Sequence, residues 1–115
     1  MLGLRCIVTL IFLAAALPTN AASQSYTANT YLSGCKEALS DKATMASGRC
    51  LGVIEGLAIL GQLTEMFCAP TGAASGQRIR VVLAFVEARP ARMHEDFRLL
   101  ALEALKEAWP CKKGS

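Results

Sequence analysis

The sequence has very few of the residues that build metal sites and catalytic sites. It holds one histidine, His94, and none of its five cysteines forms a Cys-x-x-Cys pair. Zinc and covalent haem both depend on closely spaced ligands, so the spacing argues against either cofactor. The adjacent carboxylates Glu95 and Asp96 diverge on a helix and make no acid–base pair. We therefore expect no metal, no cofactor and no catalytic site, and we place His94 near a helix start.

The chain also lacks blocks of like charge, alternating strand patterns and long hydrophobic runs. Its formal net charge is +3, and the charged residues are interspersed, so nothing resembles a nucleic-acid footprint. The longest apolar run, Cys6–Leu17, is shorter than the roughly 20 residues that a membrane-spanning helix needs. These absences argue against a nucleic-acid partner and against a retained membrane anchor.

The N-terminus does contain the layout of a secretory signal peptide. Arg5 gives a short leader one positive charge, the apolar run follows, and a proline and several small residues come next. Because small side chains fit the positions before a cleavage site, we expect a signal peptide over residues 1–22. Residues 23–29 are polar and aperiodic and are predicted to form a flexible mature N-terminus, and residues 112–115 a tail.

Signal cleavage would leave an even number of cysteines, namely Cys35, Cys50, Cys68 and Cys111. An even count in a small exported domain favours two disulfides, and oxidised cysteines cannot act as nucleophiles. Four cysteines allow three pairings, and spacing alone does not select one. We favour Cys35 with Cys50 and Cys68 with Cys111.

Apolar residues recur at helical spacing in four segments, which predicts an all-α fold: a compact bundle of about four helices cross-linked by two disulfides. The predicted helices are residues 30–39, 43–66, 75–88 and 91–109. Asp41 or Thr44 is expected to cap the second helix. The expected inward residues of the last three helices are Ala46, Cys50, Val53, Ile54, Leu57 and Leu60; Ile79, Val82, Phe85 and Val86; and Phe97, Leu100, Ala101, Ala104, Leu105 and Ala108.

Glycines stand four residues apart in the second predicted helix, at Gly48, Gly52 and Gly56. Each lowers helix stability by roughly 1 kcal/mol relative to alanine, so we expect a neighbouring helix to pack closely there. Glu55, between two of these glycines, is expected on a solvated strip; the alternative is a buried contact with an arginine. Arg78, on the third helix, is expected to face water.

Two stretches resemble the Rap/Tai immunity proteins of type VI secretion systems. Cys50-Leu51-Gly52-Val53-Ile54-Glu55-Gly56 is similar to that family's Cys-x-Gly-Tyr-Ile-x-Gly, with valine in place of the usual tyrosine. The second stretch runs Phe67-Cys68-x-Pro70-x-Gly72, followed by Gln77, Val81-Val82, Pro90, His94, Ala104-Leu105 and Trp109-Pro110-Cys111. The resemblance covers nearly the whole mature chain, and we expect a helical immunity domain over residues 30–111.

The resemblance implies a periplasmic protein, often dimeric, that binds and inhibits a papain-like peptidoglycan amidase without chemistry of its own. An inhibitor needs a preformed surface, and two exposed segments are candidates for it. The candidate contact residues are Pro70, Thr71, Gly72 and Gln77 in one segment and Arg89, Arg92 and His94 in the other.

Two other functions fit the same sequence features. Small acid-stress chaperones of the periplasm are also helical, exported and disulfide-bonded, and they expose apolar surface when acid protonates their carboxylates. Some relatives of the family are orphan secreted binding proteins without an evident toxin. A client-aggregation assay at low pH distinguishes the chaperone from the inhibitor.

Overall fold

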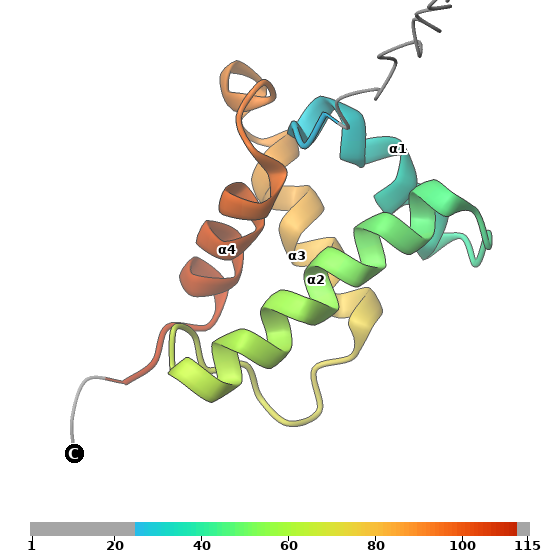
Figure 1. Ribbon diagram of the computed structural model, residues 1–115. Coiled ribbons are helices and arrows are strands. Elements are labelled where there is room, and N and C mark those ends of the chain that lie inside the picture. The colour runs from blue at the N-terminus through green and yellow to red at the C-terminus, as the bar shows by residue number, and fades with distance from the viewer. Residues whose placement is uncertain (1–24, 113–115) are drawn as a thin grey trace, which may run out of the picture.

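The computed structural model describes residues 25–112, and this part of the chain contains four α-helices and no strand (Figure 1). The predicted signal peptide, residues 23–24 and most of the predicted tail lie outside the described residues. The elements are α1 (Ala28–Leu39), α2 (Met45–Thr64), α3 (Ser75–Glu87), the 3-10 turn η1 (Pro90–Arg92) and α4 (Phe97–Ala108). The all-α prediction is confirmed.

The core lies where the four helices meet, with α1 packed mainly on α2 and α3 mainly on α4. The ring of Tyr31 on α1 stacks on Phe97 at the start of α4, with centroids 4.5 Å apart. Ile54 of α2 belongs to the same core and is completely buried. The other large apolar side chains that are fully buried include Phe67, Leu100, Leu105, Val82 and Val86.

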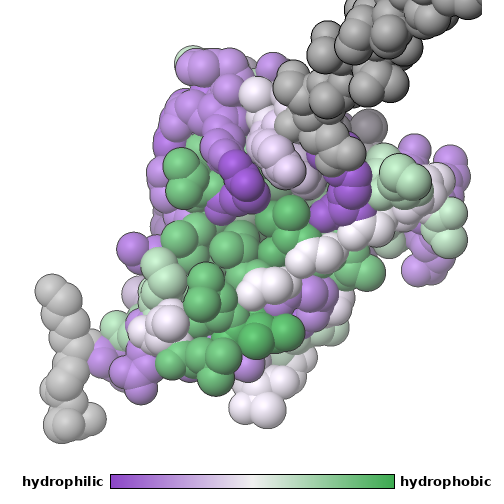
Figure 2. Space-filling view, in the orientation of Figure 1, coloured by the Kyte–Doolittle hydropathy of each residue, from purple (hydrophilic) through white to green (hydrophobic). Residues whose placement is uncertain are grey.

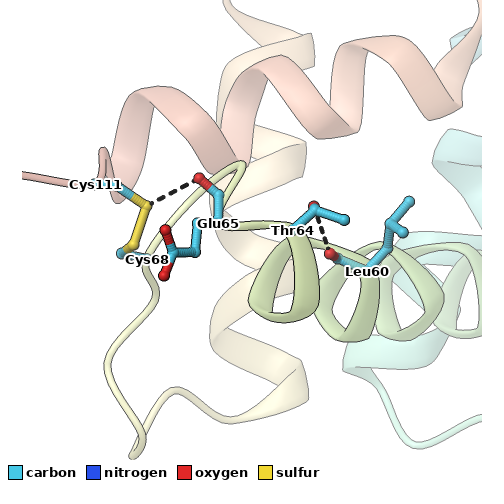
Figure 3. Close-up of a disulfide and its surroundings, with 5 residues drawn as sticks. All are labelled: Leu60, Thr64, Glu65, Cys68 and Cys111. Atoms are coloured by element: carbon cyan, nitrogen blue, oxygen red, sulfur yellow. Dashed lines mark hydrogen bonds between the residues drawn. A yellow bond between two sulfur atoms is a disulfide. The ribbon is translucent and has the colours of Figure 1, made fainter. Parts of the chain in front are cut away.

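Both predicted disulfides are confirmed. Cys35 and Cys50 are fully buried and join α1 to α2. Cys68 and Cys111 join the segment after α2 to the end of the described chain, and Figure 3 shows this bond beside the last turn of α2. Sγ of Cys111 lies 3.3 Å from the carbonyl oxygen of Glu65, the residue that terminates α2. One disulfide therefore anchors the N-terminal half of α2, and the other anchors the segment that follows its C-terminal end.

Thr44, one of the two predicted caps, is the N-cap residue of α2. Its side chain accepts a hydrogen bond from the backbone N–H of Ser47, and the Ser47 side chain accepts one from the N–H of Thr44. This reciprocal capping box satisfies two backbone donors that a helix start otherwise leaves unpaired. The helix ends when Glu65 adopts a left-handed conformation with φ of 55°, so α2 is shorter at both ends than predicted.

The predicted start of the fourth helix at residue 91 is wrong, because α4 begins at Phe97. The carbonyls of Met93 and Glu95 accept hydrogen bonds from the first N–H groups of α1 rather than from a helix of their own. The side chain of Asp96 then accepts from the N–H of Arg98 and caps α4. The segment before α4 is therefore a junction with α1.

The residues predicted to face inward are all buried on α3 but only partly so on α2 and α4. On α2, Ala46 and Leu60 are exposed, and Ser47, Ala58 and Gly61 are buried instead. Gly61 is buried because Phe67 folds back under the last turn, where its ring occupies the space that a side chain at Gly61 would fill. On α4, Ala108 is exposed, as is Leu99, at 63%.

Candidate interaction surface

The solvent face of α2 is apolar along its whole length. Met45, Ile59 and Leu63 are 84%, 60% and 79% exposed, and they lie on the side of the helix opposite the buried residues Cys50 and Ile54. Figure 2 shows a continuous hydrophobic area over the C-terminal half of α2, followed by pale residues of near-neutral hydropathy along the rest of the helix. No exposed residue of α2 carries a charge. We call this surface the α2 face.

The predicted helix neighbour of the three glycines is absent from the described part of the chain. A Cβ atom built on Gly48, Gly52 or Gly56 meets nothing within 4 Å, because all three lie on the α2 face. The three glycines therefore lower the stability of the helix, and no packing within the described chain offsets that loss. The sequence does signal this feature, since apolar residues of α2 lie on its solvent side as well as on its buried side, but the glycine spacing does not say whether the neighbouring helix belongs to the same chain.

The two charged residues of α2 both turn toward pairs within the chain. The guanidinium of Arg78 donates two hydrogen bonds to the carboxylate oxygens of Glu55, both 3.0 Å long. This corrects two expectations, because Glu55 contacts an arginine and the side chain of Arg78 is only 14% exposed. Burial raises the pKa of Glu55, but hydrogen bonds with Ser75 and Arg78 outweigh burial and hold that pKa below its ordinary value. The guanidinium of Arg49 lies over the Tyr31 ring, 4.9 Å from its centroid.

The α2 face continues at its N-terminal end into a groove of about 780 Å³. Gly48 and Leu51 line this groove as well as the helix surface, and Ile79 of α3 lies on its opposite wall. Its remaining lining residues are Ala38, Leu39, Asp41, Lys42, Ala43, Thr44, Ser47, Ser75, Gly76 and Arg80. Lys42, Arg80 and Asp41 are the charged residues among these, and the carboxylate of Glu37 accepts a hydrogen bond from the side chain of Thr44 at the same place.

The structure does not bring the predicted contact residues onto one surface. Pro70, Thr71, Gly72 and Gln77 are exposed at the start of α3, whereas Arg89, Arg92 and His94 follow its end. The 13 residues of α3 separate the two groups by about 20 Å. A partner would have to span the length of the bundle to contact both.

The arginines of the second group are engaged within the chain. Arg92 donates hydrogen bonds to Glu95 at 2.7 Å and to Glu103 at 2.8 Å, which fastens the turn to α4. These hydrogen bonds hold the pKa values of both carboxyl groups below their ordinary range. Arg89 reaches Glu107 at 3.4 Å. Both arginines therefore have a structural part in holding the turn.

Two properties of the described residues bear on function. No group of three His, Cys, Asp or Glu side chains among residues 25–112 could hold a metal ion. No helix in the same part of the chain is long and apolar enough to cross a membrane.

The family model of the Rap1a immunity proteins matches residues 17–111 of the chain. No curated protein and no solved structure matches it.

Proposed function

The chain belongs to the family of Rap1a immunity proteins, and on that premise we propose that it binds and inhibits a peptidoglycan amidase effector of a type VI secretion system. The match over residues 17–111 carries the proposal, because an immunity protein of this family acts on a secreted effector. The resemblance of the sequence motifs to Rap/Tai proteins supports a papain-like amidase as the target. Inhibition requires only that the bound protein blocks the active-site cleft, so this chain needs no chemistry of its own.

The cross-linked scaffold supports an inhibitor that acts by binding. Ordering a flexible surface on association lowers affinity, so a rigid surface is favoured. The Cys35–Cys50 bond and the Cys68–Cys111 bond hold the two ends of α2, and the Arg78–Glu55 pair holds its middle to α3. The α2 face is therefore presented in one conformation.

The proposed compartment is the periplasm. The residues before the described part have the layout of a signal peptide, and disulfides persist in oxidising compartments. A peptidoglycan-degrading effector acts in the same compartment. Export is tested by expressing the full chain in a Gram-negative host and measuring the mass of the protein in the periplasmic fraction, which should lack residues 1–22.

A homodimer is part of the proposal as well, on the resemblance to Rap/Tai proteins. Light scattering of the mature protein measures this directly, because a dimer has twice the mass of the chain. A monomeric mass at all concentrations would remove the homodimer from the proposal and leave the binding function in place.

The binding function is tested with the mature, oxidised protein and a panel of purified papain-like peptidoglycan amidases. We expect the protein to capture at least one amidase and to form a complex that survives gel filtration. Failure to capture any member of the panel would contradict the proposed function. The chaperone alternative would then be tested by its suppression of client aggregation at low pH.

A further inference from the structure

The two disulfides of the chain differ in their access to solvent. Cys35 and Cys50 are fully buried, whereas Cys68 is exposed and Cys111 is half-buried. Resting on the proposed function, we propose that Cys68–Cys111 is a reversible latch that a thiol–disulfide oxidoreductase opens and closes. Opening the latch loosens residues 69–72 while the four helices stay folded, and it thereby weakens binding of the effector.

Residues 69–72 depend on their two ends for their position. Among the described residues, none of their backbone N–H groups donates a backbone hydrogen bond. Pro70, Thr71 and Gly72 are all exposed. A segment with few hydrogen bonds and few buried contacts is the part of a fold that opens most readily. The order of this segment is therefore set by the residues that flank it.

The end of the segment at Ala73 is held without the disulfide. Ala73 is 7% exposed, and its N–H donates to the carbonyl of Pro70 at 2.9 Å. Its own carbonyl accepts a hydrogen bond from the guanidinium of Arg78, which is paired in turn with Glu55 of α2. None of these side chains belongs to the latch, so the anchor at Ala73 itself remains when the disulfide opens.

The end of the segment at Cys68 is held by two links, and one of them is the disulfide. The N–H of Cys68 donates to the carbonyl of Trp109 at 2.8 Å, and its Sγ is bonded to Cys111. Figure 3 shows this bond where the chain leaves the end of α2. Phe67, just before it, is 1% exposed and anchors α2 independently. Opening the bond therefore leaves one hydrogen bond at this end and loosens the chain from Cys68 onward.

The chain after α4 depends on the same bond. The N–H of Trp109 donates to the carbonyl of Leu105, which belongs to α4. No backbone N–H of residues 110–112 donates a hydrogen bond within the described part of the chain. When the disulfide opens, the carbonyl that holds Cys68 is thus followed by a chain end without a covalent anchor.

The opening step balances with a dithiol as the electron donor. A thiolate of the oxidoreductase attacks Sγ of Cys68, the more exposed residue, and the bond to Cys111 breaks. Cys111 leaves as a thiolate and takes a proton from water. The second thiol of the oxidoreductase then displaces Cys68, which is protonated as well, and the oxidoreductase retains a disulfide. Two electrons pass to the latch, and the reverse exchange closes it.

An open latch should weaken binding because the loosened segment has to be ordered again in the complex. Pro70, Thr71 and Gly72 are three of the predicted contact residues, and they follow Cys68 directly. We expect an affinity about tenfold lower for the open form. The buried Cys35–Cys50 bond is out of reach of the oxidoreductase and keeps α1 on α2 throughout.

The latch is tested first in the free protein, in three mature forms. These are the oxidised wild type, the wild type briefly reduced and blocked with iodoacetamide at Cys68 and Cys111, and the double variant Cys68→Ser with Cys111→Ser. Circular dichroism should show the same helix content in all three. In both open forms the backbone amides at positions 68 and 73 should lose protection from hydrogen exchange, whereas the amide of Ile54 keeps it.

The same three forms are then titrated against the amidase that the wild type captures. Both open forms should bind about tenfold more weakly, and re-oxidation of reduced, unblocked wild type should restore the affinity. Two controls should leave binding unchanged. Oxidised wild type treated with iodoacetamide alone has no free thiol to modify in the described chain, and the double variant has no latch for a mild reductant to open.

The possible failures are distinguishable. If the wild type captures no amidase, the proposed function fails and the control of binding fails with it, while hydrogen exchange still decides whether the bond is a latch. If the wild type binds and the open forms bind equally well, the inference alone is wrong. Loss of helix content in both open forms, or loss of protection at Ile54 together with position 68, would show a clamp on the whole fold and overturn the inference.

Discussion

Arg78 donates two 3.0 Å hydrogen bonds to Glu55 and so joins α3 to the middle of α2. The same guanidinium donates to the carbonyl of Ala73 at 2.6 Å, which fixes the residues that precede α3. With 14% of its side chain exposed, Arg78 depends on these acceptors for most of its hydrogen bonding. The pair thus sets the position of α3 relative to the rigid α2.

We predict that Glu55→Ala lowers the free energy of unfolding by about 2 kcal/mol, because it leaves the largely buried guanidinium of Arg78 without its carboxylate. Urea denaturation of the single and double variants at these two positions measures the coupling. The exposed pair Lys36–Glu87, with side chains 62% and 47% exposed, is the control and should show a coupling of under about 1 kcal/mol. Equal coupling in the two pairs would contradict this account.

Two glycines of α2 should respond to alanine in opposite directions. At Gly61 a Cβ would overlap the buried ring of Phe67, so Gly61→Ala should destabilise the fold by about 1–3 kcal/mol. At Gly52 the space is open, so Gly52→Ala should stabilise it by up to about 1 kcal/mol. Thermal unfolding followed by circular dichroism gives both values. A loss of stability at Gly52 would show that its position is more restricted than we describe.

The sequence was sufficient for the features that depend on local chemistry. Helical periodicity located all four helices, Thr44 was among the expected caps, and both cysteine pairs were as favoured. The segment before α4 was misassigned because its carbonyls pair with the first N–H groups of α1, a contact between residues about 65 positions apart that periodicity does not report.

The candidate surface was the hardest feature to predict. Glycines at a spacing of four indicate close approach, but they do not say whether the approaching element belongs to the same chain. The partner of Glu55, 23 residues away on α3, was likewise visible only once the helices were packed. The contact residues around Pro70 and Arg89 stay a prediction, and the unpaired face of α2 was not among the candidates that the sequence offered.

The two disulfides should differ in both reactivity and contribution to stability. Cys35 and Cys50 are fully buried, whereas Cys68 is exposed, so a mild thiol reductant should open Cys68–Cys111 first. Mass mapping of alkylated peptides after brief reduction checks the order. Reduction of Cys35–Cys50 before Cys68–Cys111 would contradict it.

Removal of each disulfide by serine substitution should also follow loop length. The bonds close loops of 15 and 43 residues, for which the chain-entropy model gives about 3 and about 4 kcal/mol. Urea denaturation should therefore show the larger loss of stability for the Cys68→Ser, Cys111→Ser variant. If that variant is the more stable of the two, strain or packing outweighs the entropy of loop closure.

Stability should fall in acid. The pKa values of Glu55, Glu95, Asp96 and Glu103 lie below their ordinary values, because hydrogen bonds from arginine favour the charged forms of the last three, and hydrogen bonds from Ser75 and Arg78 outweigh burial at Glu55. A carboxyl group whose pKa is lower in the folded state than in the unfolded state stabilises the fold. This stabilisation is fully present when the pH is above the ordinary pKa, which is 4.5 for Glu and 3.8 for Asp. That stability is lost as the pH falls through the lower, folded-state values.

Urea midpoints should therefore be nearly constant from about pH 7 to 5.5 and decline at lower pH. Arg92→Gln removes the hydrogen-bond donor to two of the carboxylates and should flatten this decline. An unchanged acid slope in Arg92→Gln would show that this network does not set the pH dependence.

The central claim is that this chain neutralises a cell-wall-degrading effector by binding alone. The most direct measurement is peptidoglycan digestion by each purified papain-like amidase as the mature, oxidised protein is titrated in. The account predicts that digestion by at least one amidase falls to background near one equivalent of protein. Digestion that stays at full rate at saturating protein, for every amidase, would contradict it.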